Sequence, residues 1–335
     1  MLTSKFEDLK AFLKDKSVLI TTHKSVDLDG ACSCFLFKFF IIHYFKNNAA
    51  IFFPEFTKYT REYLQKFSQK FKELSFSFSD DFDLSNIDLI IILDTNNLSQ
   101  VSIFEKLSVG NTQIPFIFID HHLNLKKEYE NNISSLNIIN EHVSSTSEII
   151  YDMCERFNFK LGLPYKFLLI SAILTDSGFF KYGNNDTIIR ISKLLDEQVD
   201  FQEILSTLEF KQDISEKLAR IKALQRVKVI RSKDWLIGMT HVGSYEASVA
   251  TSLISVGLDV SIVYSEKKMA FRISTRAKKS VCLETGLHLG KILEVVAEEY
   301  QGSGGGHDGA ASLNGNKDLK KVLDLIIEKI KQILN

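Results

Sequence analysis

Short apolar runs rich in β-branched and aromatic residues alternate with amphipathic segments through the first half of the chain. Runs of this kind predict strands that are buried on both faces, which is typical of a parallel sheet covered by helices. The predicted strands are VLITT at 18–22, AIFF at 50–53, LIIILD at 89–94 and PFIFID at 115–120. Helical periodicity predicts the covering helices at 30–45, 57–70, 145–158 and 165–175. We therefore expect an α/β domain built on a parallel sheet.

The pattern changes in the second half. Residues 190–222 are helical in periodicity, charged and free of Pro and Gly, which predicts a semi-rigid connector. Beyond it, alternating runs predict a second, smaller α/β unit with strands at RVKVI, WLIGMT, DVSIVYS and KMAFRIST. This unit closes with one apolar helix face formed by Leu319, Val322, Leu323, Ile326, Ile327, Ile330 and Leu334. The expected organisation is a domain at 1–189, the connector at 190–222 and a domain at 223–335.

Composition narrows the classes of partner. The chain of 335 residues has 41 basic and 42 acidic side chains and a net charge of −1, so it lacks the basic field that holds long duplex nucleic acid. Four cysteines in a chain of this length do not form a disulfide framework, which indicates a reducing compartment. The most apolar run, CFLFKFFIIHYF, is shorter than the ~20 residues of a membrane span, and the charged N-terminus does not resemble a signal peptide. We expect a cytoplasmic protein without membrane contact, and a homodimer is compatible with this composition.

Histidine and aspartate residues gather where the apolar segments of the first half end. Ligands of parallel sheets collect beyond the carboxyl ends of the strands, so these positions are candidates for a shared site. In an extended loop, Asp27 and Asp29 would share a face while Leu28 points into the core. The candidate residues are His23, Asp27 and Asp29 after the first strand, Asp94 at the end of LIIILD, Asp120, His121 and His122 at the end of PFIFIDHH, and Asp176 at the end of LLISAILTD.

The charge of this set favours a metal site. Four carboxylates around two neutral imidazoles could not stay ionised together without cations, and two divalent ions would cancel the charge. Carboxylate and imidazole ligands without thiolate favour Mn²⁺, with Mg²⁺, Co²⁺ or Fe²⁺ as alternatives. Each residue alone has a structural alternative, since an Asp at a strand exit is often a helix N-cap and a buried His is often only hydrogen-bonded. Asp120 is expected to orient its neighbours or to cap a helix rather than to bind metal.

The motifs HKSVDLD, LDTN, DHH and LTDSG, in this order, resemble those of the DHH phosphoesterase superfamily, and GSGGGHDGAAS resembles the glycine-rich signature of its DHH-associated C-terminal domain, type one. The resemblance spans nearly the whole chain and implies a Rossmann-like catalytic domain. It implies one metal held by His23, Asp27 and Asp94, and a second held by Asp29, Asp94, His121 and Asp176. The first motif departs from the usual His-x-Asn-Pro-Asp-Gly-Asp at Ser25, Val26 and Leu28, but the ligand spacing is kept.

Two divalent ions can activate water and neutralise phosphoryl charge, so hydrolysis without a covalent intermediate is the expected chemistry. Asp94 would be the bridging residue. His122 would donate a hydrogen bond or a proton to the substrate, with a structural histidine as the alternative. Ser145 and Glu148 also have counterparts near the cleft of the family, but their spacing favours a helix capping box.

Candidate substrate contacts lie in the second unit. Arg272, Ser274 and Arg276 alternate on one face of a predicted strand, where two guanidinium groups can point at phosphate; a solvated strand face is the alternative. In the glycine-rich stretch, backbone N–H groups can approach an anion and a histidine can donate to it; a flexible hinge is the alternative. The residues of this stretch are Gly304, Gly305, Gly306 and His307.

Within the superfamily, the chain resembles the nanoRNase (oligoribonuclease) and 3′-phosphoadenosine-5′-phosphate phosphatase branch. The glycine-rich stretch argues against family-two inorganic pyrophosphatases, and the length and charge argue against the long single-strand DNA exonucleases. We expect hydrolysis of very short RNA oligonucleotides, linear dinucleotides included, to mononucleotides, with activity on 3′-phosphoadenosine-5′-phosphate as a further expectation. The alternatives are a cyclic-dinucleotide or polyphosphate hydrolase and, from another class, a non-catalytic module that senses a nucleotide.

Overall fold

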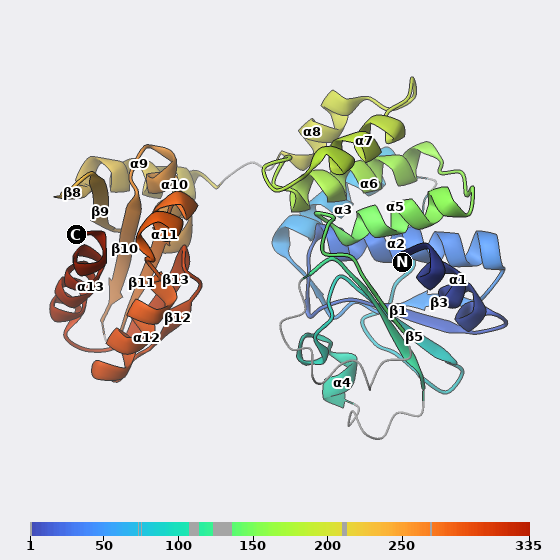
Figure 1. The fold of residues 1–335 in the computed structure, drawn as a ribbon, viewed down its shortest axis with the longest axis horizontal. Coiled ribbons are helices and arrows are strands. Elements are labelled where there is room, and N and C mark those ends of the chain that lie inside the picture. Colours follow the sequence, from blue (N-terminus) through green and yellow to red (C-terminus); the bar gives the residue numbers. More distant parts are fainter. Residues whose placement is uncertain are drawn as a thin grey trace. The chain divides into compact units, whose positions relative to one another are not determined.

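The computed structural model describes residues 2–72, 74, 76–106, 114–122, 136–209, 213–268 and 270–335, which form two compact units (Figure 1). The first unit is Met1–Phe210 and the second is Lys211–Asn335. This boundary divides the segment expected to be a connector. Helix α8 (Phe201–Leu208) buries its apolar face in the core of the first unit, whereas α9 (Ile214–Arg226) buries Ala223 in the second.

The first unit contains a five-stranded sheet in the order β3-β1-β5-β6-β7, and every pair in it is parallel. The predicted parallel α/β class is therefore confirmed. The strands are β1 (Val18–Thr21), β3 (Ala49–Ile51), β5 (Leu89–Leu93), β6 (Phe116–Asp120) and β7 (Leu136–Ile139). Two short strands, β2 (Ser25–Val26) and β4 (Glu55–Phe56), form a separate parallel pair.

Both faces of the central strands β1, β5 and β6 are buried, because these strands are apolar at nearly every position. In β5, Leu89, Ile91 and Leu93 face the larger core, and Ile90 and Ile92 face a smaller core on the other side. Figure 1 shows α2, α5 and α6 lying on one side of the sheet and α4 (Ile103–Lys106) lying on the other. The helices that contribute to the larger core are α1 (Leu2–Leu13), α2 (Leu28–Phe40), α3 (Lys58–Lys70), α5 (Thr146–Arg156), α6 (Leu163–Asp176), α7 (Asn185–Leu194) and α8.

Helix α2 continues into a π-helical turn, Ile41–Phe45, and together they are long and apolar enough to cross a membrane by length and composition. Of the window Leu28–Phe45, 67% is buried inside the fold. Its apolar character is accounted for by its contacts with α5 and α6 in the larger core.

The second unit has a six-stranded mixed sheet in the order β12-β13-β11-β10-β9-β8, in which only β9 and β10 are parallel. Its strands are β8 (Lys228–Ser232), β9 (Trp235–His241), β10 (Val260–Lys267), β11 (Ala270–Ala277), β12 (Ser303–Gly306) and β13 (Ala310–Gly315). One face carries α9 and α10 (Glu246–Ser255), and the other carries α11 (Lys279–Thr285), α12 (Leu289–Glu299) and α13 (Leu319–Leu334). The predicted apolar face of the last helix packs in this second core.

Candidate metal centre

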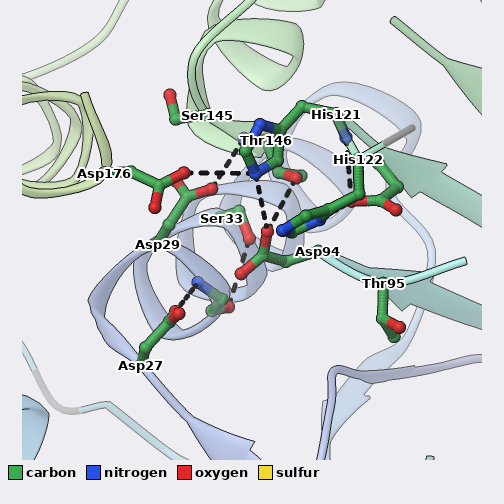
Figure 2. Close-up of polar contacts among 12 residues, drawn as sticks. Asp27, Asp29, Ser33, Asp94, Thr95, His121, His122, Ser145, Thr146 and Asp176 are labelled. Atoms are coloured by element: carbon green, nitrogen blue, oxygen red, sulfur yellow. Dashed lines mark hydrogen bonds and ion pairs between the residues drawn. The ribbon is translucent and has the colours of Figure 1, made fainter. Parts of the chain in front are cut away.

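The six predicted metal ligands converge at the carboxyl edge of the parallel sheet (Figure 2). The order of the strands explains the convergence, because β1, β5 and β6 are adjacent and all end at this edge. The ligands are His23 beyond β1, Asp27 and Asp29 at the start of α2, Asp94 after β5, His121 after β6 and Asp176 at the end of α6.

The loop predicted for Asp27 and Asp29 is wrong in one respect. Helix α2 begins at Leu28, so Asp29 lies in its first turn, and only Asp27 keeps extended backbone as the N-cap. Asp27 Oδ1 accepts from the backbone N–H of Gly30 at 3.0 Å, so the carboxylate that could bind metal also caps the helix. The sequence could not separate these two interpretations, because the same side chain caps the helix and is a candidate ligand.

The first group of candidate ligands is His23, Asp27 and Asp94. His23 Nε2 lies 3.6 Å from Asp27 Oδ1 and 3.5 Å from Asp94 Oδ2. Burial raises the pKa of Asp27, but hydrogen bonds with His23 and with the Gly30 backbone outweigh it and bring the pKa below its ordinary value. Asp27 is therefore ready to offer an ionised oxygen.

The second group is Asp29, His121 and Asp176. His121 Nε2 and Asp176 Oδ2 face each other at 3.1 Å, and neither atom has a hydrogen-bond partner among the described residues although both are buried. The ring of His121 hydrogen bonds to the backbone of Val143, and burial together with His122 lowers its pKa to about 4. Two buried acceptor atoms pointing at each other fit a cation between them, because the neutral imidazole is the form that binds metal.

Asp94 joins the two groups. Its Oδ2 faces His23, and its Oδ1 lies 3.5 Å from His121 Nε2, so each group receives one oxygen. Asp94 adopts a left-handed backbone with φ of 60°, which aspartate tolerates better than most residues and which is common at functional sites. Burial and the charge of Asp29 raise its pKa well above the ordinary value.

The remaining carboxylates also carry raised pKa values. Burial raises the pKa of Asp29 to about 6, with the charge of Asp27 adding to it. Burial, then the charges of Asp29 and Asp27, raise the pKa of Asp176 to about 8. The centre therefore retains protons near neutral pH, and divalent cations would take their place.

A turn at residues 143–147 orients three of the ligands. The backbone N–H groups of Thr146 and Ser147 donate to the two oxygens of Asp29 at 2.6 and 3.0 Å, and Thr146 Oγ1 donates to Asp94 at 3.1 Å. The same turn contains Val143, which bonds the ring of His121. These contacts could not be predicted from the sequence, because they depend on how α5 packs beside the sheet.

The predicted capping box at Ser145 and Glu148 is only half present. Ser145 Oγ caps α5 by accepting from the N–H of Glu148 at 3.3 Å. The Glu148 carboxylate instead accepts from the backbone N–H and the hydroxyl of Ser144, at 2.9 and 2.6 Å. It also pairs with Arg190 of α7 at 2.9 Å, and Arg190 forms a bidentate pair with Asp152. This buried network fixes the turn that holds the ligands.

Asp120 and His122 sit beside the second group. Asp120 is fully buried and accepts from the backbone N–H of His121, while its Oδ1 lies 2.8 Å from His122 Nδ1. Asp120 also belongs, with Asp94, His121 and His122, to a further group that could hold a metal ion, so its orienting role stays a prediction. The hydrogen bond to Asp120 raises the pKa of His122, whose side chain is 58% exposed and lines the adjacent pocket.

The steric requirement for glycine at position 30 was not predicted from the sequence. A Cβ at this position would lie 2.7 Å from Thr22 Oγ1 and 3.2 Å from Asp94 Oδ2, so a larger residue would crowd the Asp94 carboxylate. The sequence does contain a sign of this requirement, because a glycine directly follows Asp29 in the motif.

The centre opens into a pocket of about 330 Å³. Some of its lining residues are candidate ligands and His122, and the rest are polar residues that were not predicted from the sequence. Its lining residues are His23, Lys24, Ser25, Asp27, Asp94, Ser99, Gln100 and His122.

The predicted contacts of the second unit lie on β11. Arg272, Ser274 and Arg276 alternate on one face, as expected. Arg272 is exposed and Arg276 is half-buried, but Ser274 is buried on the face that α10 covers. The two arginines therefore flank a serine that is not accessible for direct contact.

The glycine-rich stretch is an edge strand rather than a free loop. Strand β12 pairs with β13, and a Cβ at Gly304 would lie 2.8 Å from the Leu293 carbonyl oxygen of α12. Close packing on a helix thus explains this glycine, and Gly305 alone of the three has open space. His307 is exposed in the turn after β12, and its carbonyl accepts from Gly290 at the start of α12.

Two family models and a relative match this chain. The family model for the DHH family, N-terminal domain, matches residues 17–175, and that for the DHHA1 domain matches residues 250–335. An uncharacterized protein of Methanocaldococcus jannaschii is 30% identical over 329 residues, which cover 96% of this chain and 94% of that protein.

Two solved structures share the fold. An exopolyphosphatase-related protein from Bacteroides fragilis superposes with a TM-score of 0.69 at 18% identity, covering 99% of this chain and 97% of the other. The DHH domain of a member of the s1p family of ribosomal proteins superposes with a TM-score of 0.58 at 13% identity, covering 99% and 91% of the two chains.

The raised pKa values predict that the metal-free protein loses stability as the pH rises from about 6.5 to 8.5. In this window the folded chain keeps a proton on Asp176, whose pKa is about 8, that the unfolded chain has released, so stability falls with pH; the raised pKa values of Asp94 and His122 act in the same direction. The low pKa of His121 has the opposite effect, but it acts only between about 4 and 6.5. Thermal midpoints measured in a chelator at constant ionic strength should show the decline. Asp176→Asn should reduce this decline of the thermal midpoint with pH, and saturating Mn²⁺ should abolish it. A midpoint that stays constant or rises with pH in the chelator would contradict the interpretation.

A second prediction concerns Arg190. Arg190→Met leaves the Glu148 charge buried and unpaired, which should destabilise the fold by about 3–5 kcal/mol and loosen the turn at 143–147. We expect Mn²⁺ affinity to fall roughly 10–100-fold, measured by calorimetry at a temperature where the variant is folded. Arg156→Met is the matched control, because Arg156 pairs with Glu7 on the surface and should cost less than about 1 kcal/mol. Unchanged affinity in a folded Arg190→Met protein would rule out the positioning role.

Proposed function

This chain belongs to the DHH family and carries a DHHA1 domain at residues 250–335, and we propose that it is a two-metal phosphodiesterase that hydrolyses very short RNA oligonucleotides to mononucleotides. Members of the DHH superfamily are metal-dependent phosphoesterases. The observation that carries the proposal is the sharing of Asp94 between two groups of ligands, one at each of its oxygens. We propose Mn²⁺ as the resident ion, from the carboxylate and imidazole ligands.

When bound, the two ions would supply an activated water molecule and neutralise charge on the phosphoryl group. The residues of the chain hold the ligand atoms in place, with Thr146 and Ser147 fixing Asp29 and Val143 fixing His121. His122 is oriented by Asp120 through Nδ1, which leaves Nε2 for the substrate. We propose that His122 donates a proton or a hydrogen bond to the leaving oxygen.

The preference for short substrates is supported by charge and by size. The net charge of −1 offers little attraction to long nucleic acid, and the pocket beside the centre is small. Arg272, Arg276 and His307 remain our predicted contacts to a terminal phosphate. Activity on 3′-phosphoadenosine-5′-phosphate, which also carries a second phosphate, is part of the proposal.

Other classes of substrate are compared in the experiment described below. The Bacteroides fragilis structure is described as exopolyphosphatase-related, but at 18% identity it supports the fold alone. Polyphosphate and cyclic dinucleotides are therefore comparison substrates. A non-catalytic sensor is disfavoured because all six ligand side chains are present and converge.

The deciding experiment is a product time course with Mn²⁺ on 5′-phosphorylated RNAs of graded length, 3′-phosphoadenosine-5′-phosphate, tripolyphosphate and a cyclic dinucleotide. We expect the highest kcat/KM on the dinucleotide and a steep decline with length. Asp94→Asn should lower turnover at least about a hundredfold, because it removes charge shared by both ions. Asp324→Asn, on an exposed face of α13, is the matched control. Turnover confined to tripolyphosphate, or the absence of any turnover, would refute the proposal.

The proposed role of His122 predicts a dependence on the leaving group. His122→Ala should lower kcat on a dinucleotide about 10²–10⁴-fold, the range typical of general acid catalysis. A nucleoside p-nitrophenyl phosphate should be much less affected, because its leaving group needs no proton. His43→Ala, an exposed histidine in the turn after α2, should change neither substrate. Equal losses on both substrates would assign His122 to the structure of the centre instead.

A further inference from the structure

The pocket beside the first ligand group has a wall that metal binding does not explain. Besides His23, Asp27, Asp94 and His122, the pocket is lined by four polar residues, which we call its polar wall: Lys24, Ser25, Ser99 and Gln100. Its volume of about 330 Å³ is at the lower end of the roughly 300–1,000 Å³ typical of ligand pockets, which suits one nucleoside-sized group. This polar wall bears hydroxyl, carboxamide and ammonium groups and no aromatic ring.

Gln100 on this wall is held in one orientation. Thr95 Oγ1 accepts from the backbone N–H of Asn97 at 3.2 Å, so its own proton is free to be donated to Gln100 Oε1, which lies 2.7 Å away. Thr95 is 2% exposed and directly follows the bridging Asp94. The backbone of Gln100 is fixed as well, because its carbonyl accepts from the N–H of Lys24 at 2.8 Å.

This arrangement presents one donor and one acceptor at adjacent positions. With Oε1 engaged by Thr95, the Nε2 group of Gln100 has no hydrogen-bond partner in the part of the chain that the structure describes and can donate. Ser99 Oγ donates to Asn97 Oδ1 at 2.8 Å, so its lone pairs can accept. A hydroxyl group, which accepts one hydrogen bond and donates another, matches this pair.

We propose that the pocket binds the ribose next to the scissile phosphate and that Gln100 and Ser99 recognise its 2′-hydroxyl. The proposal rests on the proposed function, because it takes a nucleotide as the substrate. The polar wall favours a sugar over a nucleobase, since bases are usually held by stacking on aromatic rings. The enzyme would thus select RNA over DNA at the linkage it cleaves, because the 2′-hydroxyl is the group that separates the two.

The test compares kcat/KM for a 5′-phosphorylated ribodinucleotide and its deoxyribo analogue. We expect the wild-type protein to prefer the ribodinucleotide about tenfold, the effect of one or two hydrogen bonds. Gln100→Ala should bring this ratio close to one. Thr95→Val should lower the ratio partly, because it frees the carboxamide to rotate. Gln69→Ala, an exposed glutamine on α3, is the matched control and should keep the wild-type ratio.

The outcomes separate this inference from the function on which it rests. Cleavage of both dinucleotides at equal rates by the wild-type protein would overturn ribose recognition and leave the proposed function standing. A lower rate in Gln100→Ala with an unchanged ratio would assign Gln100 to the structure of the loop and overturn its recognition role. Absence of turnover on both dinucleotides would overturn the proposed function and this inference together.

Discussion

The structure of the first unit depends on how buried negative charge is balanced at the end of its sheet. Four carboxylates lie around two imidazoles, and in the described part of the chain the ion-pair partners of Asp27, Asp94 and Asp176 are histidines. Burial raises the pKa values of Asp29, Asp94 and Asp176, so protons must supply the balance when no cation is bound. Burial of this negative charge destabilises the metal-free fold, and divalent ions would neutralise the charge.

Permanent positive charge lies beside this centre at Lys24, which lines the adjacent pocket. Arg190 is near α5, but its guanidinium group is engaged by Glu148 and Asp152. The carboxylate of Glu148 in turn accepts a hydrogen bond from the backbone of Ser144. Arg190 therefore acts on the centre through the position of this backbone segment and not through its charge. Neutral amide groups at the start of α5 bind Asp29, and they orient the carboxylate without replacing a cation.

Much of this arrangement could be predicted from the sequence, and the exceptions have physical causes. The buried strands and the ligands at their ends were predictable because apolar runs and polar residues at strand exits are local patterns. Strand β12 was not predictable, since SGGG has no apolar periodicity and pairs only because β13 and α12 lie beside it. The proposed role of Gln100 depends on a three-dimensional pocket, and its sequence neighbours do not reveal it. The start of α2 was misplaced because an N-cap aspartate and a loop ligand have the same sequence.

The altered first motif is the clearest case of a sequence change that the structure accounts for. A proline at position 26 would stiffen the loop by fixing its backbone, and this chain has Val26 instead. Val26 is fully buried, it pairs with Phe56 of β4, and its carbonyl accepts from Thr57 at 2.9 Å. On the other side, the N–H of Lys24 donates to Gln100. The loop is therefore held at both edges by hydrogen bonds rather than by a ring, and one of those bonds ties the candidate ligands to the residue that we propose to recognise the substrate.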